Sequence, residues 1–134
     1  MVAELVERFE AGTLPKADWK HGAHLTVALW YVTRHTPEDA LTRMRDGILF
    51  LNGCHGVKNT PTSGYHETLT VFWLAIVRGF AQRAVVEAID DLAALLVAEY
   101  ETRQTLWREY YSFDVVKSPE ARRNWVEPDL RPVQ

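Results

Sequence analysis

The sequence lacks the features that mark several large classes of protein. It contains one cysteine, Cys54, so an internal disulfide cannot form and nothing favours an oxidising compartment. The longest uninterrupted apolar run, residues 71–77, is far shorter than the roughly 20 residues that a helix needs to span a bilayer. The first twelve residues carry charges at every turn and have no apolar signal core. These absences predict a cytoplasmic protein with no membrane partner.

Positive charge is also scarce. The 134 residues include 15 Lys and Arg against 18 Asp and Glu, which gives a net charge of −3. The tightest basic group, Arg122 and Arg123, is diluted by Glu120 and Glu127. Proteins that bind nucleic acid need clustered positive charge to neutralise phosphates, so we expect no nucleic-acid partner.

Helical periodicity is present along most of the chain. Apolar residues recur at spacings of three and four, and no alternating strand pattern exceeds about four residues. We therefore predict an all-α fold, a single compact bundle of five to seven helices formed by residues 1–134. The expected helices cover residues 2–11, 21–35, 37–53, 65–80, 84–99, 102–112 and 119–125. The starts after Thr36 and Ser118 are the clearest, because each combines a capping hydroxyl with proline at the first helical position.

Two histidines open the second expected helix. His21 and His24 are three residues apart, so both imidazoles lie on one helix face. That face continues to Ala28, which indicates that it turns toward the core. Neutral imidazole is the commonest protein metal ligand and also a group that changes charge near neutral pH. The pair is equally compatible with an ordinary helix start, in which one ring bonds a carbonyl and the other is partly exposed.

A third histidine stands at the start of the fourth expected helix, after the glycine-rich segment 53–64. If Ser63 is the cap, Tyr65, His66 and Glu67 form the first turn. An acid such as Glu67 is favoured there by the helix dipole, whereas a charged histidine is disfavoured. We therefore expect His66 to be neutral, and no comparable structural reason accounts for its position.

These residues support three hypotheses. In the first, His21, His24 and His66 converge on a divalent metal, zinc or iron, and Glu67 acts as a further ligand or as the catalytic general base. In the second, a metal-free pocket binds a small acidic or aromatic molecule through the imidazoles, Tyr65, Trp73 and Arg78. In the third, the polar residues form a buried network that fixes helix packing. The sequence leaves open whether the chain is an enzyme, and its many aromatic residues also allow a homodimer.

Three blocks of the sequence together resemble a widespread family of uncharacterised small bacterial helical proteins. They are HGAHL at residues 21–25, GYHETLT at 64–70, and SPEAR at 118–122 followed by VEPDL at 126–130. The resemblance runs from about residue 19 to residue 130. It implies that His21, His24, His66 and Glu67 belong to one family signature, but it implies no activity. It divides the chain into an N-terminal helix with its connector (1–18), a family core (19–130) and a tail (131–134).

Overall fold

The computed structural model describes residues 1–133 and contains six α-helices joined by loops and short 3₁₀ turns, with no strand among these residues. The helices are α1 (Val2–Ala11), α2 (His21–Arg34), α3 (Pro37–Cys54), α4 (Glu67–Arg83), α5 (Ile89–Tyr100) and α6 (Pro119–Arg123). The 3₁₀ turns are η1 (Lys16–Asp18), η2 (Leu106–Glu109) and η3 (Val115–Lys117). The predicted all-α bundle is therefore confirmed.

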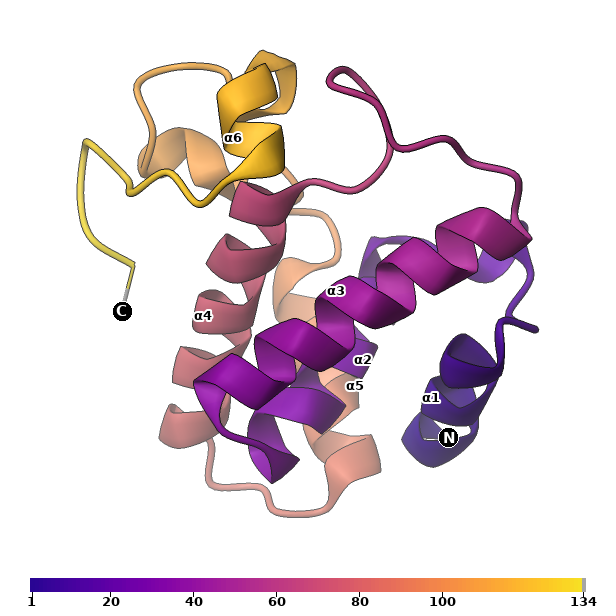
Figure 1. The fold of residues 1–134 in the computed structure, drawn as a ribbon. Helices are drawn as coiled ribbons and strands as arrows, with labels where there is room; N and C mark the ends of the chain where they lie inside the picture. The colour runs from indigo at the N-terminus through magenta and orange to yellow at the C-terminus, as the bar shows by residue number, and fades with distance from the viewer. Residues whose placement is uncertain (134) are drawn as a thin grey trace.

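Helix α2 is the centre of the bundle, because it packs against α1, α3, α4 and α5. Its residues Leu25, Val27, Leu29 and Tyr31 are all buried, so this helix is apolar around most of its circumference. Figure 1 shows α3 crossing in front of α2 and α5, with α1 and α4 on opposite sides. The first turn of α2, which carries His21 and His24, consequently lies among neighbouring elements.

Two of the predicted helix starts have the expected caps. The hydroxyl of Thr36 accepts a hydrogen bond from the Asp39 amide at 3.2 Å, and the hydroxyl of Ser118 accepts one from the Ala121 amide at 3.1 Å. Each side chain satisfies an amide that has no partner inside its helix, and the proline that follows has no amide to satisfy. The sequence signal and the local structure agree here because both are confined to four consecutive residues.

The start of α4 differs from the prediction. The helix begins at Glu67, and its cap is His66 rather than Ser63. The His66 backbone is extended, with φ −131° and ψ 107°, and its Nδ1 accepts the Leu69 amide at 3.1 Å. The hydroxyl of Ser63 instead contacts the Thr60 hydroxyl within the preceding turn. His66 thus has a structural role as a helix cap, which was not expected from the sequence.

The two helices expected at 84–99 and 102–112 are shorter than predicted. Helix α5 begins only at Ile89, and no side chain caps it there. The preceding Val85 is 94% exposed, so its side chain makes almost no packing contact that could stabilise a helical turn there. Beyond α5, the segment 102–112 contains only the 3₁₀ turn η2, in which the adjacent residues Leu106 and Trp107 are both buried. The helix predicted over 102–112 is therefore wrong, and the segment packs on the core through a single short turn.

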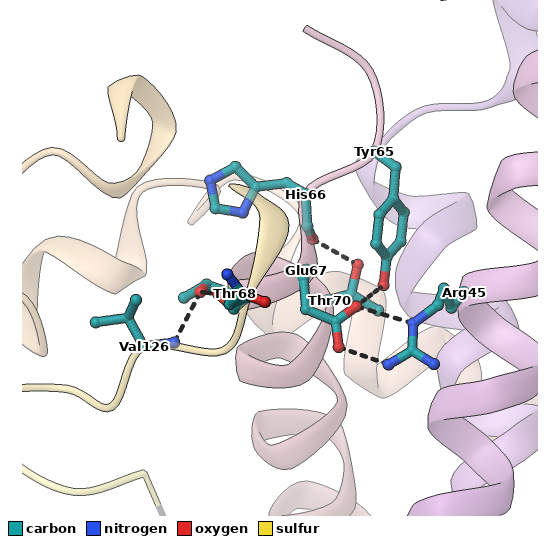
Figure 2. Close-up of polar contacts among 8 residues, drawn as sticks. Arg45, Tyr65, His66, Glu67, Thr68, Thr70 and Val126 are labelled. Carbon is teal, nitrogen blue, oxygen red and sulfur yellow. Dashed lines mark hydrogen bonds and ion pairs between the residues drawn. The ribbon is translucent and has the colours of Figure 1, made fainter. Parts of the chain in front are cut away.

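The C-terminal segment is fastened to the first turn of α4. The buried hydroxyl of Thr68 donates to the Asn124 carbonyl at 2.7 Å and accepts the Val126 amide at 3.0 Å. Arg122 donates to the carbonyls of Gly64 and Val116, at 2.8 and 3.0 Å. Figure 1 shows α6 lying over the start of α4, and Figure 2 shows the contact of Thr68 with Val126. These bonds hold η3 and α6 against the helix start that carries His66 and Glu67.

Candidate functional site

A cavity of about 630 Å³ lies between α2, α3, α4 and the segment 104–116. Its size falls within the range of small-molecule sites, about 300–1,000 Å³. Its lining is mainly apolar and aromatic, with a few polar groups. The residues that define its walls are Trp19, His21, His24, Ala28, Met44, Ile48, Tyr65, His66, Leu69, Trp73, Trp107 and Arg108.

His21 and His24 both line this cavity, as expected from their spacing on one helix face. The ring of His24 stacks on Trp19, with centroids 3.7 Å apart and planes 22° apart. The ring of His21 meets Trp73 edge-on at a centroid distance of 4.6 Å. Each imidazole is therefore held in place by an indole, and both indoles also line the cavity.

Burial keeps both imidazoles neutral. It lowers the pKa of His24 to about 3, and the neighbouring His21 acts in the same direction. Burial also lowers the pKa of His21 below its usual value, although a hydrogen bond to the Tyr100 backbone and the charge of Glu101 oppose the shift. At neutral pH the two rings therefore present hydrogen-bonding groups without charge.

His66 also borders the cavity, but both of its ring nitrogens have partners within the chain. Nε2 lies 2.7 Å from the carbonyl of Val115, and Nδ1 accepts the amide of Leu69. A carbonyl can only accept, so the proton is on Nε2 and Nδ1 is the acceptor. Burial lowers the pKa of His66, and the nearby guanidinium of Arg122 lowers it further. His66 is therefore neutral, as expected from the sequence, and joins η3 to α4.

Glu67 points away from His66 and is held by two side chains. Its carboxylate accepts two hydrogen bonds from Arg45, at 2.6 and 3.0 Å, and one from the Tyr65 hydroxyl at 2.7 Å. Figure 2 shows this cluster on the side of α4 opposite the His66 ring. Burial acts to raise the pKa of Glu67, but the bonds from Arg45 and Tyr65 outweigh it, so the pKa lies below its usual value. Glu67 lines a separate groove outside the cavity.

The structure separates the other predicted binding residues. Tyr65 and Trp73 line the cavity, and Tyr65 also borders the groove that contains Glu67. Arg78 lies further along α4 and does not line the cavity. It forms no ion pair with Glu67 or Asp90 among residues 1–133, and its Nη2 is buried without a partner there. Burial lowers the pKa of Arg78, and Glu38 opposes that shift.

The structure does not bring the predicted metal ligands into a metal-binding arrangement. Among residues 1–133 no three His, Cys, Asp or Glu side chains are placed to hold an ion together. His21 and His24 are adjacent on α2, whereas the nitrogens of His66 are directed to Val115 and Leu69. A site made from all three histidines would require His66 to give up at least one of these hydrogen bonds, because the coordinating nitrogen must be free.

Two residues that contact the predicted site were not predicted from the sequence: Trp19, which stacks on His24, and Arg45, which binds Glu67. Trp19 follows η1 and precedes α2, outside the helix that carries His24, so no helical spacing relates the two stacked rings. Arg45 and Glu67 are separated by 22 residues and a long loop. Such pairs can be linked from sequence only by positions that co-vary among related sequences, and a single sequence gives no co-variation.

No helix in the part of the chain that the structure describes is long and apolar enough to cross a membrane. The site is defined by the chain's own geometry, namely two neutral imidazoles held against indoles on the wall of a mainly apolar cavity. Comparisons of the chain with models of protein families, with curated proteins and with solved structures give no match.

Proposed function

We propose that this chain binds a small, mainly apolar molecule in the cavity beside His21 and His24. The observation that carries the proposal is the cavity itself, about 630 Å³ in volume and walled by Trp19, Trp73 and Trp107. The cavity is partly open to solvent, and concave, mostly apolar spaces of this size are typical of small-molecule sites. A molecule bound there would bury its apolar surface against these indoles.

The position of Glu67 favours binding over hydrolysis by a general base. Its two oxygens are engaged by Arg45 and Tyr65, and the residue lies outside the cavity. A base must reach the proton that it removes, either directly or through one water. We therefore propose that Glu67 holds Tyr65 in the cavity wall and does not act as a base.

Filling the cavity tests the proposal directly. Ala28 is 2% exposed and lines the cavity, so Ala28→Phe places a ring in the space that a ligand would occupy. We expect the native chain to bind 4-ethylanisole, a small uncharged aromatic probe, in calorimetric titrations, and we expect A28F to lose at least tenfold in affinity. Ala94→Phe, on the exposed face of α5, is the matched control and should bind like the native chain. Equal binding by A28F and the native chain would exclude the cavity as the site.

A metal site remains a second candidate, because His21 and His24 are adjacent and neutral, the form in which imidazole binds zinc or iron. Under the cavity proposal, untagged protein purified without chelator carries far less than one equivalent of any transition metal. Nearly stoichiometric zinc or iron, lost in His24→Phe, would favour the metal site.

On the sequence grounds given above, we also propose that the protein is cytoplasmic, that it belongs to the family it resembles and that it forms a homodimer. On the same grounds we propose that it has no nucleic-acid or membrane partner.

A further inference from the structure

His24 differs from the other two histidines of the cavity, His21 and His66, in that its ring has no hydrogen-bond partner at all in the described part of the chain. Neither of its ring nitrogens forms a hydrogen bond within residues 1–133, and neither is sealed from the open space as the Nε2 of His21 is. Its ring is fixed by stacking on Trp19 at 3.7 Å. Because its nitrogens are open to the cavity and have no partner among the described residues, His24 has hydrogen-bonding capacity that a ligand could satisfy.

Gln104 and Thr105 line the cavity at its exposed edge, whereas the polar side chains further inside are already engaged. The Thr70 hydroxyl donates to the His66 carbonyl at 2.8 Å, the Tyr65 hydroxyl donates to Glu67, and the Asn52 amide donates to Asn59 at 3.2 Å. The Nε2 of His21 is buried and unpartnered, but it is covered rather than open to the cavity. His24 is therefore the polar group through which the interior of the cavity can recognise a ligand.

The charges at the cavity favour an uncharged ligand. Both imidazoles are neutral and offer no counter-charge to an ion. The charged residues of the lining, Arg108 and Asp114, have opposite signs and come from one segment, 104–116, which forms part of the cavity wall. An ion moved into an apolar cavity loses its hydration, and without a paired charge it does not regain that free energy.

We propose that His24 is the hydrogen-bonding anchor of the cavity and that the ligand is an uncharged, mainly apolar ring compound carrying a hydroxyl group. A neutral imidazole has one accepting nitrogen and one N–H, and a hydroxyl can complement either of them. The indoles of the lining suit the apolar remainder of such a molecule. This inference rests on the proposed function, since it requires that the cavity binds a ligand.

Two matched probes separate the inference from the proposed function. 4-Ethylanisole is the methyl ether of 4-ethylphenol, so the phenol can donate a hydrogen bond and the anisole cannot. In titrations of the native chain at pH 7.5 we expect the phenol to bind about threefold to tenfold more tightly, the size of one neutral hydrogen bond. We expect 4-ethylbenzoate, the charged analogue, to bind more weakly than either.

His24→Phe keeps a flat ring beside Trp19 but removes both nitrogens. In this variant we expect the preference for the phenol to disappear, while the affinity for the anisole stays within about twofold of the native value. His35→Phe, at the far end of α2 and outside the cavity, is the control and should keep the preference. If H24F no longer folds, His24→Asn, which has hydrogen-bonding groups in a different place, should fold and show a reduced preference.

The possible failures are distinct. If the native chain binds phenol and anisole equally, or if H24F keeps the preference, the cavity binds ligands but His24 is not the anchor. Tightest binding of the benzoate would overturn the inference of an uncharged ligand. If neither the phenol nor the anisole binds, both the inference and the proposed function fail for aromatic compounds of this size.

Discussion

At the scale of single residues, the same side chain has several roles in this chain. His66 caps a helix and bonds the Val115 carbonyl, and Nε2 of His55 contacts the Leu14 carbonyl at 2.7 Å. His21 and His24 instead line the cavity. The difference arises from the groups within reach of each ring. A histidine next to an unpaired carbonyl or amide forms hydrogen bonds with the backbone, whereas the ring of His24, which faces the cavity, keeps its nitrogens available.

The neutrality of His24 predicts how stability changes with pH. Burial lowers the pKa of His24 to about 3 in the folded chain, whereas the unfolded chain takes up the proton near pH 6.5. Because the unfolded state binds the proton first, stability falls as the pH decreases from about 6.5 toward 3. We expect this residue to contribute a loss of about 2 kcal/mol between pH 7 and pH 5.

Urea unfolding of the native chain and of His24→Phe at these two pH values measures the effect. H24F should lose about 2 kcal/mol less than the native chain over the same interval. Glu67 does not obscure the result. Its pKa is lowered on folding, so its stabilisation is present above its ordinary pKa and is lost only in more acidic solution. Parallel losses in both proteins would contradict the assignment of His24 as a buried neutral base.

At the scale of elements, the start of α4 depends on one side chain that serves two neighbours. Removing the His66 ring leaves the Leu69 amide uncapped and the buried Val115 carbonyl without its partner. A lost cap costs about 1 kcal/mol, and an orphaned buried acceptor about 1–3 kcal/mol. We therefore expect His66→Ala to lower the free energy of unfolding by about 2–4 kcal/mol.

His66→Asn is the matched comparison for that variant. Asparagine is a good N-cap but its side chain is too short to replace the imidazole at Val115, so H66N should recover about 1 kcal/mol of the loss. Denaturant unfolding of the three proteins reports the differences. An H66A protein that is as stable as the native chain, but that has lost a bound metal, would reverse the role given to His66 and favour the metal site.

At the scale of the whole molecule, α1 packs against the outer side of the cavity wall through Trp19. Phe9 of α1 is fully buried, and its ring centroid is 5.0 Å from that of Trp19, the residue on which His24 stacks. Gly47 of α3 allows this arrangement, because a Cβ at residue 47 would lie 2.3 Å from the Phe9 ring. A contact between α1 and α3 thus positions a side chain in the cavity wall.

Gly47→Ala should therefore affect both stability and binding. The added methyl group displaces Phe9, and we expect a loss of about 1–3 kcal/mol together with weaker binding of 4-ethylanisole. Gly53→Ala, on the same helix, is the control, because no atom lies within 4 Å of its added Cβ. Alanine also has the higher helix propensity, so G53A should be as stable as the native chain or more so. If G47A and G53A behave alike in calorimetry and unfolding, α1 does not support the cavity.

Much of the fold could be predicted from the sequence, because helices are encoded locally. The starts after Thr36 and Ser118 are set by residues within one turn, and the all-α class follows from the spacing of apolar residues. The errors arose where distant contacts decided the outcome. His66 replaced Ser63 as the cap of α4 while its ring met a carbonyl 49 residues away. Segment 102–112 forms a single 3₁₀ turn with Leu106 and Trp107 buried, instead of the helix that its apolar spacing predicted.

The sequence by itself determined that His21 and His24 share one face of a helix, because three residues make nearly one turn. It also determined that Tyr65, His66 and Glu67 stand together at a helix start. Only the tertiary structure decided which way each of them faces. It directs Glu67 to Arg45 and the nitrogens of His66 to Val115 and Leu69, and it leaves His24 beside Trp19 on a cavity wall. Apart from Leu69, which His66 caps within one helical turn, those partners are distant in sequence or unrelated by helical spacing, and such contacts depend on how helices pack rather than on how they form.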